Sequence, residues 1–481
     1  MTLIWIIAII FALYLRTLNY FFLIDDYVLR HDYLWNVPTE SVDPAKFYIK
    51  KPHWSYRLFM IAMHVVNTSI IYLLWGWAPA LLFAAHPMSA WCVVWVTGNY
   101  YATTAYFILI AYYILHAFPT WWGAAIALPI YLSALNSTVG SLTFPFLAMF
   151  MPWGWTMFFP LIAFLNGKRF RAGLKTRLDI IQGSKIEDTK FTFRRLFFMT
   201  KVMARYIYFV FVPMKVFYFG LWHERIRNYR TAWDDAHSAN KEFWVSFALC
   251  AVVFAGGMLI SPIGTLWFFI LMAVHSQFNV LGQTFAQRYL YLPMIGLCVV
   301  AGTLLQPYPL IVIAIAGFLA CKTHYVIPNW RNMEDLLKNE INMNPDCGAT
   351  FSMVAQYYMA VKPLHSHPFY MINYISYLMR RSISLAPEIW TVRLNYAAYL
   401  TQIGRLDESI AETRETLRLL KEFGTTRETP IFDNVRNQEK RLLELREKAI
   451  MDMNNQQVEM RRQADLKNRK ERRDKNKEEK K

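Results

Sequence analysis

Long stretches without charge constrain the fold of this chain more than any other feature. Residues 58–167 contain no Asp, Glu, Lys or Arg. A helix needs about 20 mostly apolar residues to cross the ~30 Å hydrocarbon core of a bilayer. Backbone groups in lipid must find their hydrogen bonds within the segment, so each span has to be helical. The sequence therefore predicts an all-α, polytopic membrane protein.

Eleven apolar segments have the length and composition of candidate spans. They are residues 2–24, 58–75, 77–97, 101–117, 120–135, 143–166, 196–220, 243–260, 263–285, 290–305 and 307–322. The segment 196–220 is the weakest because it contains Lys201, Arg205 and Lys215. That composition also fits a helix lying in the membrane interface.

Beyond Lys322 the composition becomes that of a soluble helical domain. The stretch NYAAYLTQIGRLDESIAETRETLRL predicts two amphipathic helices joined by a turn at Gly404. This pattern is typical of a tetratricopeptide repeat, whose period is about 34 residues. Ile383 lies 34 residues before Leu417, which indicates a degenerate unit upstream. We divide the chain into a membrane domain at 1–322, a repeat-like helical domain at 323–425, and a charged helix with a basic, poorly ordered tail at 426–481.

The distribution of charge predicts the orientation in the membrane. The connection 167–195 holds nine basic and three acidic residues, whereas the first loop, 25–57, holds five of each. By the positive-inside rule the first of these is cytoplasmic. The N-terminus is then also cytoplasmic, and with an odd number of spans the repeat-like domain is extracytoplasmic. The basic tail mixes both signs and lacks aromatic residues, so no nucleic-acid partner is expected.

The cysteines exclude two common classes of site. None of the five stands in a CxxC pair, which argues against both a redox motif and a zinc site. No cofactor is indicated and no metal site is predicted. Asp25 and Asp26 with Asp32 do offer the oxygen ligands that a divalent cation would take.

Two adjacent carboxylates, Asp25 and Asp26, follow the first apolar segment directly. A carboxylate beside an apolar cavity can act as a general base when desolvation raises its pKa. The same residues can also simply end a helix at the water boundary. The pair taken alone favours the simpler interpretation.

Two histidines fall in apolar segments, where ionisable groups are expensive and often functional. His64 lies three residues before Asn67, so both share one helix face. His86 precedes Pro87, which interrupts the third apolar segment. Each histidine can line a polar pocket or serve as a hydrogen-bonded packing residue.

The stretch GQTFAQRYLYLP places Gln287, Arg288 and Tyr289 before a later apolar segment. Arginine can hold a phosphate through paired, charge-assisted hydrogen bonds. The alternative is an arginine that anchors the span at the interface, with its tyrosines in the aromatic belt. By the predicted orientation this stretch lies on the same side of the membrane as the acid pair.

The order of several motifs resembles a known family. These motifs are IDD in the first loop, LFMIAMHVVNTSIIYLL, ALLFAAHPMSAWCVVWVTGN, MARYIYFVFVPMKVFYFG, QRYLYLPMIGLC and NWRNMEDLLKNEINMNPD. Together they are similar to the transmembrane and tetratricopeptide-repeat O-glycosyltransferases of the GT-C class. The resemblance touches most of residues 20–420.

This resemblance implies a helical bundle that uses a polyprenyl-phosphate sugar donor. Asp25 or Asp26 would be the catalytic base, with Asp26 preferred. Arg288, assisted by Gln287 and Tyr289, would bind the donor phosphate. The residues implied to line the same pocket are His86, His64, Asn67 and Asn99.

The chain departs from the family at several charged positions. Trp91 stands near the place of a family glutamate, and Asn99 follows Gly98 where the family often has arginine. Asn136 and Ser137 replace a later Lys-Glu pair. These losses put the identity of the donor and of the acceptor in question, together with activity itself.

The leading hypothesis is a glycosyltransferase that moves a sugar from a polyprenyl-phosphate donor to a hydroxyl of a protein or glycan, with inversion. Membrane lipids and an acceptor held by the repeats are the expected partners. One alternative is a membrane-anchored scaffold that has lost catalysis, which the missing charges favour. Another is a transporter of lipid-linked sugars, although the sequence has no inverted repeat.

Overall fold

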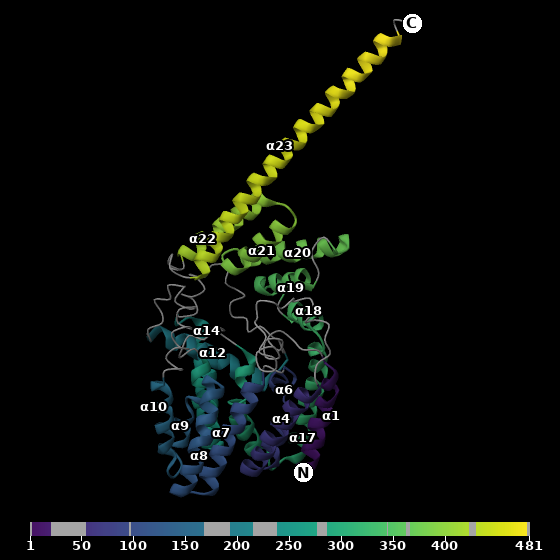
Figure 1. Cartoon of the computed structure of the whole chain (residues 1–481). Coiled ribbons are helices and arrows are strands. Elements are labelled where there is room, and N and C mark those ends of the chain that lie inside the picture. Colours follow the sequence, from purple (N-terminus) through teal and green to yellow (C-terminus); the bar gives the residue numbers. More distant parts are fainter. Residues whose placement is uncertain are drawn as a thin grey trace. The chain divides into compact units, whose positions relative to one another are not determined.

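Helices form all the regular secondary structure in the part of the chain that the structure describes. The computed structural model describes residues 2–20, 54–95, 98–167, 193–214, 238–276, 286–343, 345–361, 366–422 and 430–478. Within those ranges every element is an α-helix or a short 3-10 helix (Figure 1). The predicted all-α class is confirmed.

The chain forms two compact units. The larger contains residues 1–181 and 186–386, and the smaller contains 182–185 and 387–481. The division therefore falls at Pro387, within the segment 323–425 that the sequence analysis treats as one domain.

The larger unit begins with a set of mostly apolar helices, many of which lie roughly side by side along one direction (Figure 1). They are α1 (Leu3–Tyr14), α4 (Trp54–Trp75), α5 (Trp77–Ala85), α6 (Ala90–Val94), α7 (Asn99–Ala117), α8 (Trp121–Ser137), α9 (Phe144–Ala148), α10 (Phe158–Asn166), α12 (Phe193–Phe211), α14 (Lys241–Ile260), α15 (Pro262–Ala273), α16 (Met294–Leu305) and α17 (Pro309–Val326). We call this set of helices the bundle.

Three helices of the bundle are long and apolar enough to cross a membrane. They are α4, α14 and α17 together with its 3-10 extension η11 (Ile327–Trp330). A fourth span results if α5 and the segment Pro87–Val94, which bend by 60° at their break, count as one. Eleven spans therefore remain a prediction. Some predicted spans are interrupted: 143–166 divides into α9, the short η6 (Gly154–Met157) and α10.

The outward surface of the bundle is strongly apolar. Leu259 on α14 is 90% exposed and Leu310 on α17 is 81% exposed. Ile4 on α1 and Val252 on α14 are exposed in the same way. Soluble monomers rarely expose apolar patches of this extent, and a lipid environment covers such a surface.

Helix α16 occupies the centre of the bundle because two glycines let its neighbours approach closely. A Cβ atom on Gly296 would lie 2.3 Å from the Gly264 carbonyl oxygen of α15. A Cβ atom on Gly302 would lie 2.5 Å from Pro79 of α5. Close approach through small residues is typical of helix packing in membranes. The packing fixes α16, and with it the residues that precede it.

Helix α12 is amphipathic and does not resemble the other members of the bundle. Arg195 and Lys201 are buried, while Phe193 and Tyr208 are exposed. Arg205 forms an ion pair of 3.3 Å with Glu242 of α14. This mixed character agrees with the weakness of the predicted span 196–220.

Three further helices of the larger unit follow the bundle. They are α18 (Met333–Met343), α19 (Gly348–Val361) and α20 (Phe369–Leu385). α19 and α20 pack as an antiparallel pair, in which Ser382 Oγ donates a 2.7 Å hydrogen bond to the Gly348 carbonyl. A Cβ atom on Gly348 would lie 2.5 Å from Ala386 Cβ, so the small residue permits this contact.

The smaller unit consists of α21 (Trp390–Gln402), α22 (Leu406–Glu422) and α23 (Pro430–Glu478). Gly404 joins α21 and α22 with a φ of +77°, a backbone conformation that favours glycine. The apolar core contains Leu417, Leu420, Phe432 and Val435. The predicted pair of helices around Gly404 is therefore present.

Helix α23 continues to Glu478, so the segment predicted as a poorly ordered tail is helical up to this residue. Its sequence alternates acidic and basic residues at the spacing of a helical turn. Examples are Glu444 with Lys448 and Glu459 with Arg462. Each such pair stabilises a helix by about 0.2–0.5 kcal/mol. Mixed charge taken alone predicts a solvated tail, whereas this spacing favours a helix.

Candidate functional site

The break between α5 and α6 is held by His86, the histidine that the sequence analysis places in a pocket. His86 is buried, and its Nδ1 accepts a 3.2 Å hydrogen bond from the Met88 amide. The ring proton is then on Nε2, which donates a 2.9 Å hydrogen bond to the Val210 carbonyl of α12. Both ring nitrogens are used, and the start of α6 is fixed relative to α12.

Helix α6 in turn fixes the short 3-10 helix η10 (Gln287–Leu290) that precedes α16. The Trp91 indole Nε1 donates a 3.3 Å hydrogen bond to Gln287 Oε1. Cys92 Sγ lies 3.8 Å from the Arg288 carbonyl oxygen. Trp91 and Gln287 are fully buried. Gln287 therefore anchors η10 to α6 through its own side chain.

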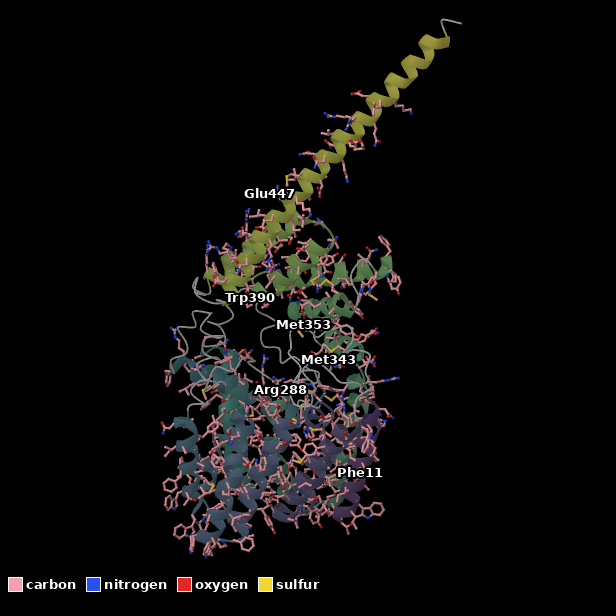
Figure 2. The ribbon with its side chains drawn as sticks, viewed as in Figure 1. Phe11, Arg288, Met343, Met353, Trp390 and Glu447 are labelled. Atoms are coloured by element: carbon pink, nitrogen blue, oxygen red, sulfur yellow. The ribbon has the colours of Figure 1, made fainter. Side chains whose placement is uncertain are left out.

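Arg288 is the cation at this place, and aromatic rings surround it. Its Cζ lies 5.9 Å from the ring centre of Trp91, 5.6 Å from Trp95 and 5.3 Å from Tyr289. Arg288 Nε donates a 3.3 Å hydrogen bond to the Tyr101 hydroxyl of α7. The Arg288 side chain is half-buried at one end of the bundle (Figure 2). We call Trp91, Trp95, Tyr101 and Tyr289 the aromatic frame.

Tyr289 is held from its other side by His275, which follows α15 in the 3-10 helix η9 (Val274–Ser276). The two rings stack with centres 4.4 Å apart and planes 13° apart. A Cβ atom at Gly140 would lie only 2.8 Å from His275 Nε2, so a residue without a side chain is required there. The stacked histidine limits the movement of the frame.

A second polar cluster lies inside the bundle and joins His64 to Asn67 through Tyr291. The Tyr291 hydroxyl lies 2.8 Å from His64 Nδ1 and accepts a 3.3 Å hydrogen bond from Asn67 Nδ2. Asn67 Nδ2 also donates a 3.0 Å hydrogen bond to the Ala102 carbonyl of α7. All three side chains are buried. The predicted shared face of His64 and Asn67 therefore carries a real contact, made through Tyr291, which the sequence suggested only as a tyrosine of the aromatic belt.

The remaining predicted site residues lie elsewhere or outside the described ranges. Asn99 begins α7, two residues before Tyr101. Asn136 Nδ2 and Ser137 Oγ donate to the carbonyls of Leu132 and Ser133 in their own helix α8. Asp25, Asp26 and Asp32 lie outside the described residues. In the part of the chain that the structure does describe, no three His, Cys, Asp or Glu side chains are grouped to hold a metal ion.

Three contributors to this arrangement were missed from the sequence: Trp95, Tyr101 and His275. The rings of Trp and Tyr are common at the ends of membrane spans, so their presence alone does not identify a site. The useful signal was the large number of aromatic residues in apolar segments that contain no acidic side chain. A cation that packs among such segments has no carboxylate partner there, and the faces of aromatic rings can stabilise it instead.

Comparison with known proteins adds no relative to this picture: no protein-family model, curated protein or solved structure matches the chain.

Proposed function

We propose that the chain is an integral-membrane glycosyltransferase that transfers a sugar from a polyprenyl-phosphate donor to a hydroxyl of a protein or glycan. The observation that carries the proposal is Arg288, a half-buried cation held in an aromatic frame at the end of an apolar bundle. The resemblance described above points to the same chemistry.

The aromatic frame makes Arg288 suitable for binding a phosphate group. Aromatic rings within about 6 Å of a guanidinium attract it electrostatically and favour its charged form. Here they also fix the orientation of the group, since Nε is bound to Tyr101. A fixed cation can bind a phosphate oxygen through a charge-assisted hydrogen bond, and the low dielectric constant among the rings strengthens that attraction.

The bundle offers the other half of the donor site. A polyprenyl tail is apolar and resides in the bilayer, where the outer surface of the bundle is apolar as well. A donor can therefore keep its tail in lipid and bring its phosphate to Arg288 at the bundle end. In this arrangement Gln287 and Tyr289 act by shaping the frame, and His86 acts by fixing α6.

The reaction is a single displacement. Asp26, or Asp25, removes the proton of the acceptor hydroxyl, and the hydroxyl oxygen forms a bond to the anomeric carbon of the sugar. The bond from that carbon to the phosphate oxygen breaks, and its electron pair leaves with polyprenyl phosphate. Arg288 stabilises the negative charge of this leaving group, and the configuration at the anomeric carbon inverts.

We assign the acid pair, Arg288 and the repeat-like helices to the extracytoplasmic side and the N-terminus to the cytoplasm. The support is the excess of basic residues in 167–195 together with an odd number of spans. The helix pairs α19–α20 and α21–α22 are then placed where a protein or glycan acceptor arrives.

Transfer by purified protein tests the proposal. The full chain is reconstituted in nanodiscs with polyprenyl-phosphate mannose or glucose carrying a labelled sugar, and labelled acceptor is counted. We expect Arg288→Gln to lower the transfer efficiency about 100-fold, which corresponds to about 2.7 kcal/mol of transition-state stabilisation. Arg205→Gln, which removes an arginine from a surface ion pair, serves as the matched control and should change transfer less than twofold.

Variants of the acid pair, tested in the same assay, examine the proposed catalytic base. Asp25→Asn combined with Asp26→Asn should abolish transfer while donor binding persists. Full transfer by this double variant would refute the assignment of the acid pair as the catalytic base. Label that crosses a vesicle membrane without reaching an acceptor would identify a transporter instead.

A second candidate is a membrane-anchored scaffold without catalytic activity, and one observation favours it. Trp91 stands near the place of a family glutamate and is fully buried against Gln287. Arg288 therefore faces an indole where the family would place a carboxylate. A scaffold predicts no transfer with any donor, together with partner binding that survives Arg288→Gln.

A further inference from the structure

The outer face of α20 carries a groove that the proposed transfer does not use. It measures about 530 Å³, within the usual range for ligand sites. The residues that line it share one face of the helix: Asn373, Ser376, Tyr377, Arg380, Arg381 and Ser384. The opposite face of α20 is buried and includes Ile375, Leu378 and Met379.

The groove is basic. α20 contains Arg380 and Arg381 next to each other and no acidic residue in its sequence. Both arginines are exposed, and within the described residues neither forms an ion pair. The nearby charges of α18 do not compensate them, because Glu334 and Lys338 already pair with each other at 2.7 Å. Two adjacent cations without a structural partner favour an anionic ligand.

The groove is also aromatic. Tyr377 is 56% exposed, and its ring stacks on that of Tyr374 with centres 6.5 Å apart. Phe369 and Tyr370 extend the exposed aromatic surface toward the start of the helix. Exposed rings of this kind are enriched where proteins bind other proteins. They suit a ligand with apolar groups between its charges.

The length of the groove distinguishes a peptide from a small anion. Asn373 and Ser384 are eleven residues apart on the helix, which is about 16 Å at 1.5 Å per residue. An extended peptide covers that length with about five residues at ~3.3 Å each. Ser376 and Ser384 each donate their hydroxyl hydrogen to a carbonyl of α20, so their oxygens can accept from peptide N–H groups. The amide of Asn373 can bind the peptide backbone as well. A free phosphate would occupy only a small part of this space.

We propose that the α20 groove binds an extended acidic segment of a partner protein. If the chain is the transferase proposed above, that partner is its acceptor, and this second statement rests on the proposed function. Binding itself does not depend on catalysis, so the two statements can fail separately.

Fluorescence anisotropy with the full chain in phosphatidylcholine nanodiscs tests the binding. The probe is a fluorescein-labelled eight-residue peptide of alternating acidic and small polar residues, and its control carries amides in place of the carboxylates. We expect the acidic peptide to bind at least tenfold more tightly. Because the contacts are exposed ion pairs, binding should weaken as NaCl rises from 50 to 300 mM.

Two variants with the same loss of charge locate the site. Arg380→Ala with Arg381→Ala should weaken peptide binding 10- to 100-fold. The matched control is Arg461→Ala with Arg462→Ala, which removes an adjacent, exposed arginine pair from α23 and should change the affinity less than twofold. A third variant, Arg380→Glu with Arg381→Glu, should bind the corresponding lysine peptide, a gain that misfolding cannot produce.

The remaining outcomes overturn the proposal or divide it. The proposed binding at the groove is refuted if both alanine pairs lose the same peptide affinity, or if the acidic and neutral peptides bind equally well. Arginine-dependent binding to phosphatidylserine vesicles or to an anionic polysaccharide, without peptide binding, replaces the peptide by a different partner. Peptide binding without sugar transfer would support the α20 groove as a binding site and contradict the proposed transferase activity. Sugar transfer without peptide binding would support the transferase activity and contradict peptide binding at the groove.

Discussion

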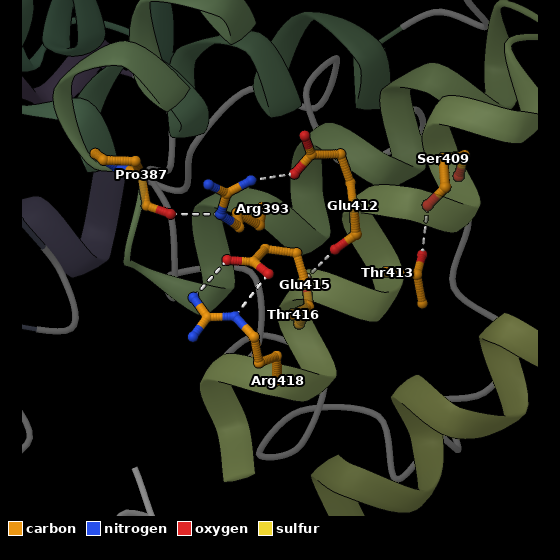
Figure 3. A network of polar contacts seen from close by, with 8 residues as sticks. All are labelled: Pro387, Arg393, Ser409, Glu412, Thr413, Glu415, Thr416 and Arg418. Carbon is orange, nitrogen blue, oxygen red and sulfur yellow. Dashed lines mark hydrogen bonds and ion pairs between the residues drawn. The ribbon is translucent and has the colours of Figure 1, made fainter. Parts of the chain in front are cut away.

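The bundle and the smaller unit use polar side chains in different ways. In the bundle, polar groups are few, and those near η10 make specific contacts, such as Trp91 with Gln287 and Asn67 with Tyr291. In α21–α23, charged groups are many and pair at or near the surface, as Arg414 does with Glu439. Figure 3 shows one part of this second pattern.

This difference indicates where a single substitution should lower stability the most. Close packing and buried hydrogen bonds tolerate little change, because the surroundings cannot relax or bring in water. Surface ion pairs are screened and replaceable, and each contributes about 0–1 kcal/mol. The following predictions test this contrast in order of decreasing effect.

Gly296→Ala should produce the largest loss. The new Cβ atom would lie 2.3 Å from the Gly264 carbonyl oxygen and 2.6 Å from the Phe268 amide nitrogen, so two backbones must separate. We expect a loss of about 3 kcal/mol in the free energy of unfolding, at the upper end of typical overpacking. Thermal unfolding in detergent measures it. Gly256→Ala is the matched control, because no heavy atom lies within 4 Å of its Cβ position. Equal melting temperatures for the two variants would contradict the close packing of α15 and α16.

Tyr291→Phe should produce the next largest loss. It removes one hydroxyl and leaves His64 Nδ1 and Asn67 Nδ2 each with one contact fewer, in a buried place. We expect about 2 kcal/mol, measured by the same unfolding assay. Tyr208→Phe on α12 is the control, since that ring is 51% exposed. A change below 0.5 kcal/mol, about the effect expected of an ordinary surface substitution, would show that the cluster is not a structural network.

The bundle also shows what the sequence could and could not predict. The absence of charge in 58–167 was enough to predict helices, and the shared face of His64 and Asn67 followed from their spacing. The aromatic frame did not follow, because Tyr101, Trp91 and Arg288 are far apart in the chain and meet only when α6, α7 and η10 pack. Helical periodicity describes one helix at a time and contains no information on which ends meet.

The breaks in the predicted spans have a similar explanation. Pro87 predicted an interruption. The 60° bend is accompanied by a hydrogen bond from His86 to Val210, 124 residues away, which the sequence pattern could not indicate. The repeat period was also only approximate: the ends of α20 and α22, Leu385 and Glu422, are 37 residues apart rather than 34. A sequence period estimates the length of a helix pair, and the loop lengths then alter it.

Within the smaller unit, Arg393→Ala should be more harmful than Arg405→Ala. Arg393 is largely buried and connects α21 to the Pro387 carbonyl and to Glu412, at 2.6 Å, on α22 (Figure 3). Arg405 forms a surface pair with Glu408, three residues away. We expect losses of about 1.5 kcal/mol and below 0.5 kcal/mol, respectively. Hydrogen exchange of α22 amides in the full chain measures both. Equal protection in the two variants would contradict the difference in burial.

The smallest effect should be the response of α22 to acid through Glu415. Two hydrogen bonds from Arg418, at 2.6 and 2.8 Å, hold the pKa of the Glu415 carboxyl below its usual value (Figure 3). A lowered pKa means that the pair stabilises the folded state at pH values above the unfolded pKa of about 4.3. That contribution is lost as the pH falls through the folded pKa. The effect is small because Arg418 is about half exposed and water screens the pair.

Glu415→Gln isolates this contribution. At pH 7 the variant should lower the exchange protection of α22 slightly. Once the pH is below the folded pKa of Glu415, the variant and the natural chain should become equal, after intrinsic exchange rates are corrected for pH. The control is Glu408→Gln, which removes the partner of Arg405 from the other end of the same helix. Protection that falls with acid equally in the natural chain and in Glu415→Gln would assign the acid response to other carboxylates. A loss larger than that of Arg393→Ala would reverse the ranking on which the comparison of surface and buried contacts depends.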